Sequence, residues 1–156
     1  MFLNLRNLTL AFMGLASIGT LTAGVKAHEQ LFMNLSLDQA LVMASKQKRI
    51  VFVDFCTAWC GACKKLDEET WRDGRVIEQL KKNTIPIKLD AEKEQMVTDK
   101  YLVKAYPTLL FLNADGSILA RIVGYQIPKQ FIEKLQGVMA SRSTKVPGRG
   151  LVDGDH

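Results

Sequence analysis

Residues 50–65 constrain the fold most, because they join an apolar strand-like run to a Cys-x-x-Cys. Residues 50–55 are β-branched or aromatic except for Asp54, which is typical of a central strand buried on both faces. Beyond Cys60, oppositely charged side chains recur four positions apart, a spacing that favours a helix. We therefore expect Cys60 at a helix N-terminus, where free amides and the helix dipole favour a thiolate, and Cys63 one turn further along.

Two cysteines at this spacing can carry out thiol–disulfide exchange. One attacks a disulfide and the other resolves the resulting mixed disulfide, and the placement assigns Cys60 as the exposed nucleophile and Cys63 as the resolving thiol. A Cys-x-x-Cys can also be half of a zinc site. The chain has three cysteines, no second pair, and only two histidines, His28 and His156, so a four-ligand structural zinc site is not expected.

Length and charge set broad limits on the class of protein. With 156 residues, 47 % of them hydrophobic, the chain can bury one sizeable core without disulfide staples, so its cysteines are free to be catalytic. The net charge is +5 for the whole chain and +3 for the residues beyond 27, which include 19 basic and 16 acidic side chains. The basic residues are scattered among acidic ones along the sequence, which argues against nucleic-acid binding.

The two ends of the chain differ in composition from its middle. Arg6, an apolar run over residues 8–25 and the sequence Val25-Lys26-Ala27 predict a secretory signal peptide that is cleaved after Ala27. The alternative is an uncleaved membrane anchor, because the apolar run is nearly long enough to span a bilayer. Residues 142–156 hold three glycines and one proline, and we expect a disordered tail there. The folded domain is therefore predicted over residues 28–141.

Hydrophobic spacing and turn residues predict the order of elements within the domain. Helices are expected over residues 37–48, after residue 60, briefly near 76–80, over 92–104 and from Pro128, and strands over 50–55, 84–90, 108–112 and 118–123. Pro86 cannot donate to a ladder, so its strand should lie at a sheet edge. This order allows a parallel pair followed by a hairpin, in an α/β fold with helices on both faces of a mixed sheet. Four strands are expected, with five as the alternative.

The active-site segment resembles that of the thioredoxin superfamily. The residues Trp59-Cys60-Gly61-Ala62-Cys63 are similar to the signature Trp-Cys-Gly-Pro-Cys, which in the family follows a strand reading Val-Asp-Phe. The match includes Asp54 and Lys64, and it resumes at Tyr106-Pro107-Thr108-Leu109 and at Val123-Gly124. It covers residues 36–140 and implies the thioredoxin fold.

The resemblance also implies roles for residues around the cysteine pair. Pro107 would be a cis-proline that opposes the cysteines, and the backbone of Tyr106 would pair with an extended substrate segment. An ordinary trans proline at the entry of a strand would do neither. Trp59, Gly61 and Ala62 would contribute to substrate binding. Because Ala62 replaces the family's proline, the reduction potential of thioredoxin does not carry over.

Asp54 and Cys56 are the two unusual residues of the predicted central strand. Burial would raise the pKa of Asp54 and suit it to exchange protons with Cys63, whereas the alternative is a strand-end carboxylate that reaches solvent. In thioredoxin a lysine on the neighbouring strand accompanies this acid. Here we assign Pro86 to that position, so we expect Asp54 to lack such a partner. Cys56 replaces a tryptophan of the family and is expected to be a small buried core residue rather than a third redox thiol.

Together these features predict a secreted or periplasmic thiol:disulfide oxidoreductase that works as a protein-disulfide reductase, with no cofactor besides the Cys60–Cys63 disulfide. Lys65 and the acidic helix that ends in Trp71 resemble the periplasmic C-terminal domain of the transmembrane reductase DsbD. That resemblance implies a transmembrane electron donor of the DsbD type and protein substrates with disulfides. A disulfide oxidase or isomerase with the same site is one alternative. The other is a Cu(I)-binding module in which Cys60 and Cys63 hold the ion with the help of a nearby Met. If cleavage leaves His28 as the N-terminus, its amine and imidazole could also chelate copper.

Overall fold

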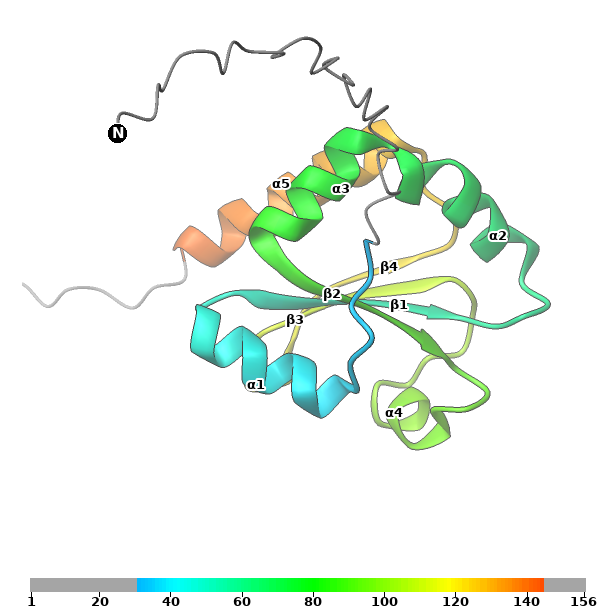
Figure 1. Cartoon of the computed structure of the whole chain (residues 1–156), viewed down its shortest axis with the longest axis horizontal. Coiled ribbons are helices and arrows are strands. Elements are labelled where there is room, and N and C mark those ends of the chain that lie inside the picture. Colours follow the sequence, from blue (N-terminus) through cyan, green and yellow to red (C-terminus); the bar gives the residue numbers. More distant parts are fainter. Residues whose placement is uncertain (1–30, 145–156) are drawn as a thin grey trace, which may run out of the picture.

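Four strands in the order β2-β1-β3-β4 form the central sheet of the computed structural model, which describes residues 31–144 (Figure 1). The strands are β1 (Ile50–Cys56), β2 (Thr84–Asp90), β3 (Thr108–Leu112) and β4 (Ile118–Val123). β1 runs parallel to β2 and antiparallel to β3, and β3 pairs with β4 in a hairpin. The predicted mixed four-stranded sheet is confirmed, and the described residues add no fifth strand to it.

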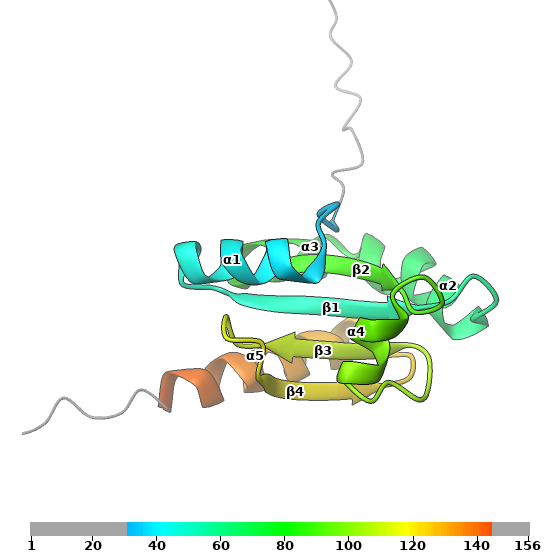
Figure 2. The same cartoon turned by 90° about the horizontal axis from the view of Figure 1, so that it is seen from below.

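Helices cover both faces of this sheet, as predicted. They are α1 (Leu37–Gln47), α2 (Gly61–Glu68), the short 3-10 helix η1 (Thr70–Arg72), α3 (Gly74–Asn83), α4 (Gln95–Lys100) and α5 (Pro128–Thr144). α1 and the residues that follow α4 pack on one face, whereas α2, η1, α3 and α5 pack on the other (Figure 2). Within residues 31–144, no helix has the length and hydrophobicity that crossing a bilayer would require.

β1 separates two hydrophobic clusters, because successive side chains of a strand point to opposite faces. Val51, Val53 and Phe55 belong to the cluster beneath α1, and Ile50 and Phe52 belong to the cluster that includes α3 and α5. All six residues from 50 to 55 are buried. By the same alternation, Asp54 points toward the α2 side of the sheet.

The segment after β2 differs from its prediction. We expected a helix over residues 92–104, but α4 contains only Gln95–Lys100. Leu102 adopts a left-handed backbone conformation with φ of 50°, and this ends the helix. The turn places Tyr101 and Val103 in the core, and their burial explains why the chain departs from helical spacing here.

The ends of the domain are held by specific backbone contacts. Ser36 and Gln39 form a capping box at the start of α1, and Pro86 lies in the edge strand β2 as expected. The Met33 amide donates to the Pro86 carbonyl at 2.8 Å. α5 continues to Thr144, so the first three residues of the predicted tail are helical. The predicted signal peptide, residues 1–27, lies outside the described residues, as does the rest of the tail.

Candidate active site

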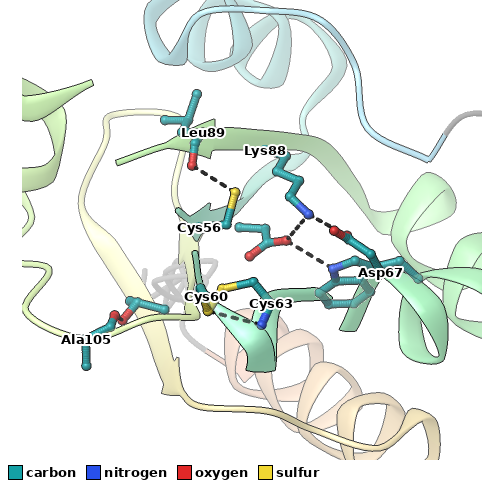
Figure 3. The surroundings of a disulfide bond; sticks show 10 residues. Cys56, Cys60, Cys63, Asp67, Lys88, Leu89 and Ala105 are labelled. Atoms are coloured by element: carbon teal, nitrogen blue, oxygen red, sulfur yellow. Dashed lines mark hydrogen bonds and ion pairs between the residues drawn. A yellow bond between two sulfur atoms is a disulfide. The ribbon is translucent and has the colours of Figure 1, made fainter. Parts of the chain in front are cut away.

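Cys60 and Cys63 form a disulfide at the start of α2 (Figure 3). Cys60 is the N-cap residue, as predicted, and its Sγ accepts a hydrogen bond from the Cys63 amide at 3.1 Å. The expected exposed nucleophile is 4 % exposed in this oxidised form, because its Sγ is bonded to Cys63 and capped by that amide. The free amides of the helix start stabilise negative charge on a sulfur at this position, so they favour a thiolate after reduction.

Trp59 and the proline loop lie together beside the cysteine pair. The Trp59 side chain is 66 % exposed, meets the Tyr106 ring edge-on with 5.8 Å between centroids, and donates from Nε1 to Glu92 Oε1 at 2.9 Å. The Tyr106–Pro107 peptide bond is cis, as the family resemblance implied. The Pro107 carbonyl accepts from the Gly124 amide at 2.8 Å, which ties this loop to the turn after β4.

Gly61 and Ala62 form the first turn of α2, between the two cysteines. A Cβ atom at Gly61 would meet no atom within 4 Å, so no neighbour requires glycine there. Their assignment to substrate binding, like that of Trp59 and Tyr106, stays a prediction.

Asp54 is fully buried, as expected of a carboxylate in a central strand. Its Oδ2 accepts a hydrogen bond from Trp71 Nε1 at 3.0 Å, and its buried Oδ1 has no hydrogen-bond partner among the described residues. Burial raises the pKa of Asp54 to about 6, and the positive charge of Lys88 and the Trp71 hydrogen bond oppose that rise. The raised pKa is the predicted one, and the alternative of a strand-end carboxylate in solvent is wrong.

The expectation that Asp54 lacks a lysine partner is also wrong. The register of the parallel pair sets Phe52 opposite Pro86 and Asp54 opposite Lys88. The Lys88 Nζ lies 3.5 Å from Asp54 Oδ2. The sequence does not fix the register of two parallel strands. The residue that pairs with Asp54 therefore lies two positions beyond Pro86, which the sequence analysis places there. Lys88 carries the one positive charge in β2, a signal that could have identified it.

Two further residues that the sequence did not indicate, Asp67 and Phe32, lie beside Lys88. Asp67 of α2 forms a second, shorter ion pair with the Lys88 ammonium group. The Lys88 Nζ also lies 5.6 Å from the centre of the Phe32 ring, which in turn packs edge-on against Trp71 at 5.8 Å. Phe32 thus covers the network from the side of the N-terminal segment.

A pocket of about 260 Å³ links this network to the cysteine pair. It is bordered by Cys63 and includes Lys88, Asp67 and Cys56 among its lining residues. A pocket of this size with charged side chains in its wall admits water, through which protons can move between solvent, the ion pairs and Cys63. The arrangement therefore provides both a resolving thiol and a nearby group that titrates close to neutral pH.

Cys56 is half-buried at the end of β1 and is not part of the disulfide. Its Sγ donates to the Leu89 carbonyl at 3.6 Å. Burial raises the pKa of the Cys56 thiol to about 11, and the negative charge of Asp54 adds to the rise. A thiol that stays protonated at neutral pH is a poor nucleophile, which favours the predicted packing role, although Cys56 is less buried than a core residue.

A metal site would require several ligating side chains in one place. Within residues 31–144, no three His, Cys, Asp or Glu side chains gather in a way that could hold a metal ion. His28, which we considered as a copper ligand, lies outside these residues.

Comparisons with known proteins agree with this geometry. The family model described as a thioredoxin-like domain matches residues 37–138. The thiol:disulfide interchange protein DsbD of Yersinia pestis is 31 % identical over 105 residues, which are 64 % of this chain but only 18 % of that protein. The chain thus matches less than a fifth of the length of this curated relative.

Solved structures show the same fold over nearly their whole length. A putative disulphide-isomerase from Bacteroides thetaiotaomicron has a TM-score of 0.63 at 34 % identity, and covers 70 % of this chain and 93 % of its own. A thioredoxin from Thermus thermophilus has a TM-score of 0.62 at 22 % identity, and covers 77 % of this chain and 95 % of its own.

Proposed function

Because the chain belongs to the thioredoxin-like family of disulfide oxidoreductases, we propose that it reduces disulfide bonds in exported proteins. The observation that carries the proposal is the Cys60–Cys63 disulfide at the start of α2, whose Cys63 lines a pocket together with the ion-paired side chains of Lys88 and Asp67. A purely structural disulfide would not require a proton-exchanging group that is paired with Lys88 in the wall of this pocket. Asp54, with a pKa of about 6, is such a group.

The reaction begins with the reduced pair. The Cys60 thiolate attacks one sulfur of a substrate disulfide, so the substrate S–S bond breaks, a mixed disulfide forms on Cys60, and the other substrate sulfur leaves and takes up a proton. Cys63 then loses its proton and attacks the Cys60 sulfur, which releases the second substrate thiol. Two electrons have moved to the substrate, and the Cys60–Cys63 disulfide is restored.

Each element of the site contributes to one of these steps. The amides at the start of α2 stabilise the Cys60 thiolate for the first attack. In the second step the Asp54 carboxylate accepts the proton that Cys63 must lose, directly or through water in the pocket, because its raised pKa brings it close to neutral pH. Trp59 and Tyr106 form an aromatic surface beside the pair that can receive a substrate segment.

Export and the electron donor are parts of the same proposal. The charged and apolar pattern of residues 1–27 supports export to an oxidising compartment. A reductase there is left oxidised after each turnover, so a dithiol donor must return two electrons to it. Similarity to DsbD supports a transmembrane protein of that type as the donor.

The reduction potential of the Cys60–Cys63 pair tests the direction of the reaction. Equilibration with a thiol buffer, followed by quantification of both forms, should give a potential at or below about −200 mV, as for reducing members of the fold. A potential close to about −120 mV would instead identify a disulfide oxidant.

A trapping experiment tests the class of substrate. In Cys63→Ser the first attack can proceed but resolution cannot, so exported proteins should accumulate as mixed disulfides on Cys60. The adducts should disappear with reductant and should be missing in the Cys60→Ser control. If folded Cys63→Ser formed none in cells, protein disulfides would not be the substrates.

A further inference from the structure

Three helices end beside the end of the sheet that lies farthest from the cysteine pair, where β1 begins. In Figure 1, α1, α3 and α5 end at the left, whereas β1 runs to the right into the loop that precedes α2. The seven residues of β1 place these two ends of the sheet about 20 Å apart along the strand. Six basic side chains gather where the helices end, and we name this set the basic end: Lys46, Lys48, Arg49, Lys81, Lys82 and Arg142.

Hydrogen bonds hold the basic end together. Arg142 of α5 donates from Nη2 to the Lys48 carbonyl at 2.8 Å, and Arg49 donates to the carbonyls of Lys81 and Thr84. These contacts join residues from three helix ends, although 32 to 94 positions separate them in the sequence. The basic residues that are scattered along the sequence are therefore clustered in space.

The domain is electrically polarised as a result. Residues 31–144 contain seventeen basic and thirteen acidic side chains, and the basic end holds six of the basic ones. The surrounding segments, residues 43–50, 79–84 and 138–144, contain no acidic side chain. The rest of the described chain has eleven basic and thirteen acidic residues, so the positive excess lies entirely at this end.

Helix dipoles account for part of this pattern, because a cation is favoured in the last turn of a helix. The two arginines also serve the fold through their bonds to carbonyl groups. Lys46, Lys48 and Lys82 are different, since they are exposed and form no ion pair with any residue in the described part of the chain. Three lysines directed into solvent beside two arginines leave a surface of uncompensated positive charge.

The chemistry of the surface indicates its partner. The large hydrophobic side chains that are exposed in the domain all lie outside the three segments of the basic end. A protein interface has an apolar core, and single-stranded nucleic acids need aromatic side chains for stacking. Anionic lipid headgroups need neither, because they attract a basic surface through charge alone.

We propose that the basic end is a docking surface for a bilayer that contains anionic phospholipid. Docked in this way, the domain directs Cys60 away from the bilayer and toward soluble proteins. Each lysine or arginine close to an anionic surface raises the affinity about fivefold, so three lysines supply roughly a hundredfold. The attraction decays within a Debye length and is weakened by salt.

The test compares the full chain on vesicles of phosphatidylcholine with and without phosphatidylglycerol. Any binding through residues 1–27 is common to all variants. The basic end is therefore measured by the anionic increment, which is the factor by which phosphatidylglycerol raises the affinity for the vesicles. Lys46→Glu/Lys48→Glu/Lys82→Glu should lower this increment at least about thirtyfold. The matched control, Lys104→Glu/Lys129→Glu/Lys134→Glu, makes the same change in net charge at exposed positions elsewhere and should retain most of the binding.

Orientation is tested by the intrinsic fluorescence of Trp59, which is 66 % exposed near the cysteine pair. A quencher carried on the lipid headgroups should leave this fluorescence unchanged on bound protein, because Trp59 faces away from the bilayer. Strong quenching would overturn the proposed orientation. If both triple variants lost the same share of the anionic increment, the docking surface itself would be overturned. The same holds if the wild type showed no anionic increment at low ionic strength, even if the protein bound another polyanion.

Discussion

Lys88 and Asp54 lie directly opposite each other on parallel strands, and their Nζ and Oδ2 atoms are 3.5 Å apart. The ammonium group is shared with Asp67, so a single positive charge serves two carboxylates. Burial by itself would lower the pKa of Lys88, but the two neighbouring carboxylates outweigh it and the pKa is raised. Lys88 therefore stays charged at neutral pH, and it opposes the effect of burial on Asp54 without cancelling it.

Replacing Asp54 by Asn should stabilise the protein at pH 8. The pKa of Asp54 is raised from 3.8 to about 6 on folding, so above pH 6 the folded state bears a buried charge. The cost is on the order of 3 kcal/mol, and it disappears as pH falls from 7 toward 4 because the folded state takes up the proton first. Urea denaturation should show the gain from Asn at pH 8 and little gain near pH 4.

The same variant should slow the resolving step at neutral pH by at least about tenfold, since Asn cannot accept the Cys63 proton. Single-turnover reduction of a model disulfide measures this step. Stability and rate then change in opposite directions. A rate equal to that of the wild type would remove Asp54 from proton transfer, whatever happens to stability.

Lys88→Gln should raise the pKa of Asp54 further, because the positive charge that opposes the effect of burial is gone. The pH profile of the resolving step should therefore move to higher pH. Lys93→Gln makes the same charge change in an exposed pair with Asp90 at 3.4 Å and should leave the profile in place. A shift of equal size in both variants would indicate a general effect of net charge.

Cys56 should resist alkylation in the folded protein at pH 7. With a pKa of about 11, only about one Cys56 thiol in ten thousand is ionised, so iodoacetamide should label reduced Cys60 far faster. Mass spectrometry after short exposure identifies the labelled sites, and denatured protein, in which all three cysteines react, is the control. Fast labelling of Cys56 would reopen its role as a third redox thiol.

Trp59→Ala should weaken the use of protein substrates more than that of small disulfides. The change removes an exposed aromatic surface that packs against Tyr106, and we expect kcat/KM for a protein disulfide to fall about tenfold. Met96→Ala, at a side chain that is 89 % exposed on α4, is the matched control. Equal losses with protein and small disulfides would place Trp59 in the chemistry rather than in recognition.

Local patterns predicted the parts of this fold that depend on local sequence. The bounds of β2, β3 and β4 agree with the expected strands, because hydrophobic runs and turn residues delimit them. The N-cap position of Cys60 follows from the charge spacing of the next helix.

What the sequence did not reveal depends on contacts between distant segments. The partner of Asp54 is set by the register of β1 and β2, which α2, η1 and α3 separate in the chain. The early end of α4 comes from the burial of Tyr101 and Val103 against the sheet. The basic end could not be predicted from the sequence, because its residues come from the ends of three helices that are far apart in the chain.

The hydrogen bond from the Met33 amide to the Pro86 carbonyl also bears on self-association. In a strand, the nitrogen and carbonyl of one residue face the same side, so Pro86 offers a neighbouring chain no donor and a carbonyl that is already occupied. Unprotected sheet edges are where folded copies add to one another and grow into aggregates. The β2 edge is closed to such growth at Pro86.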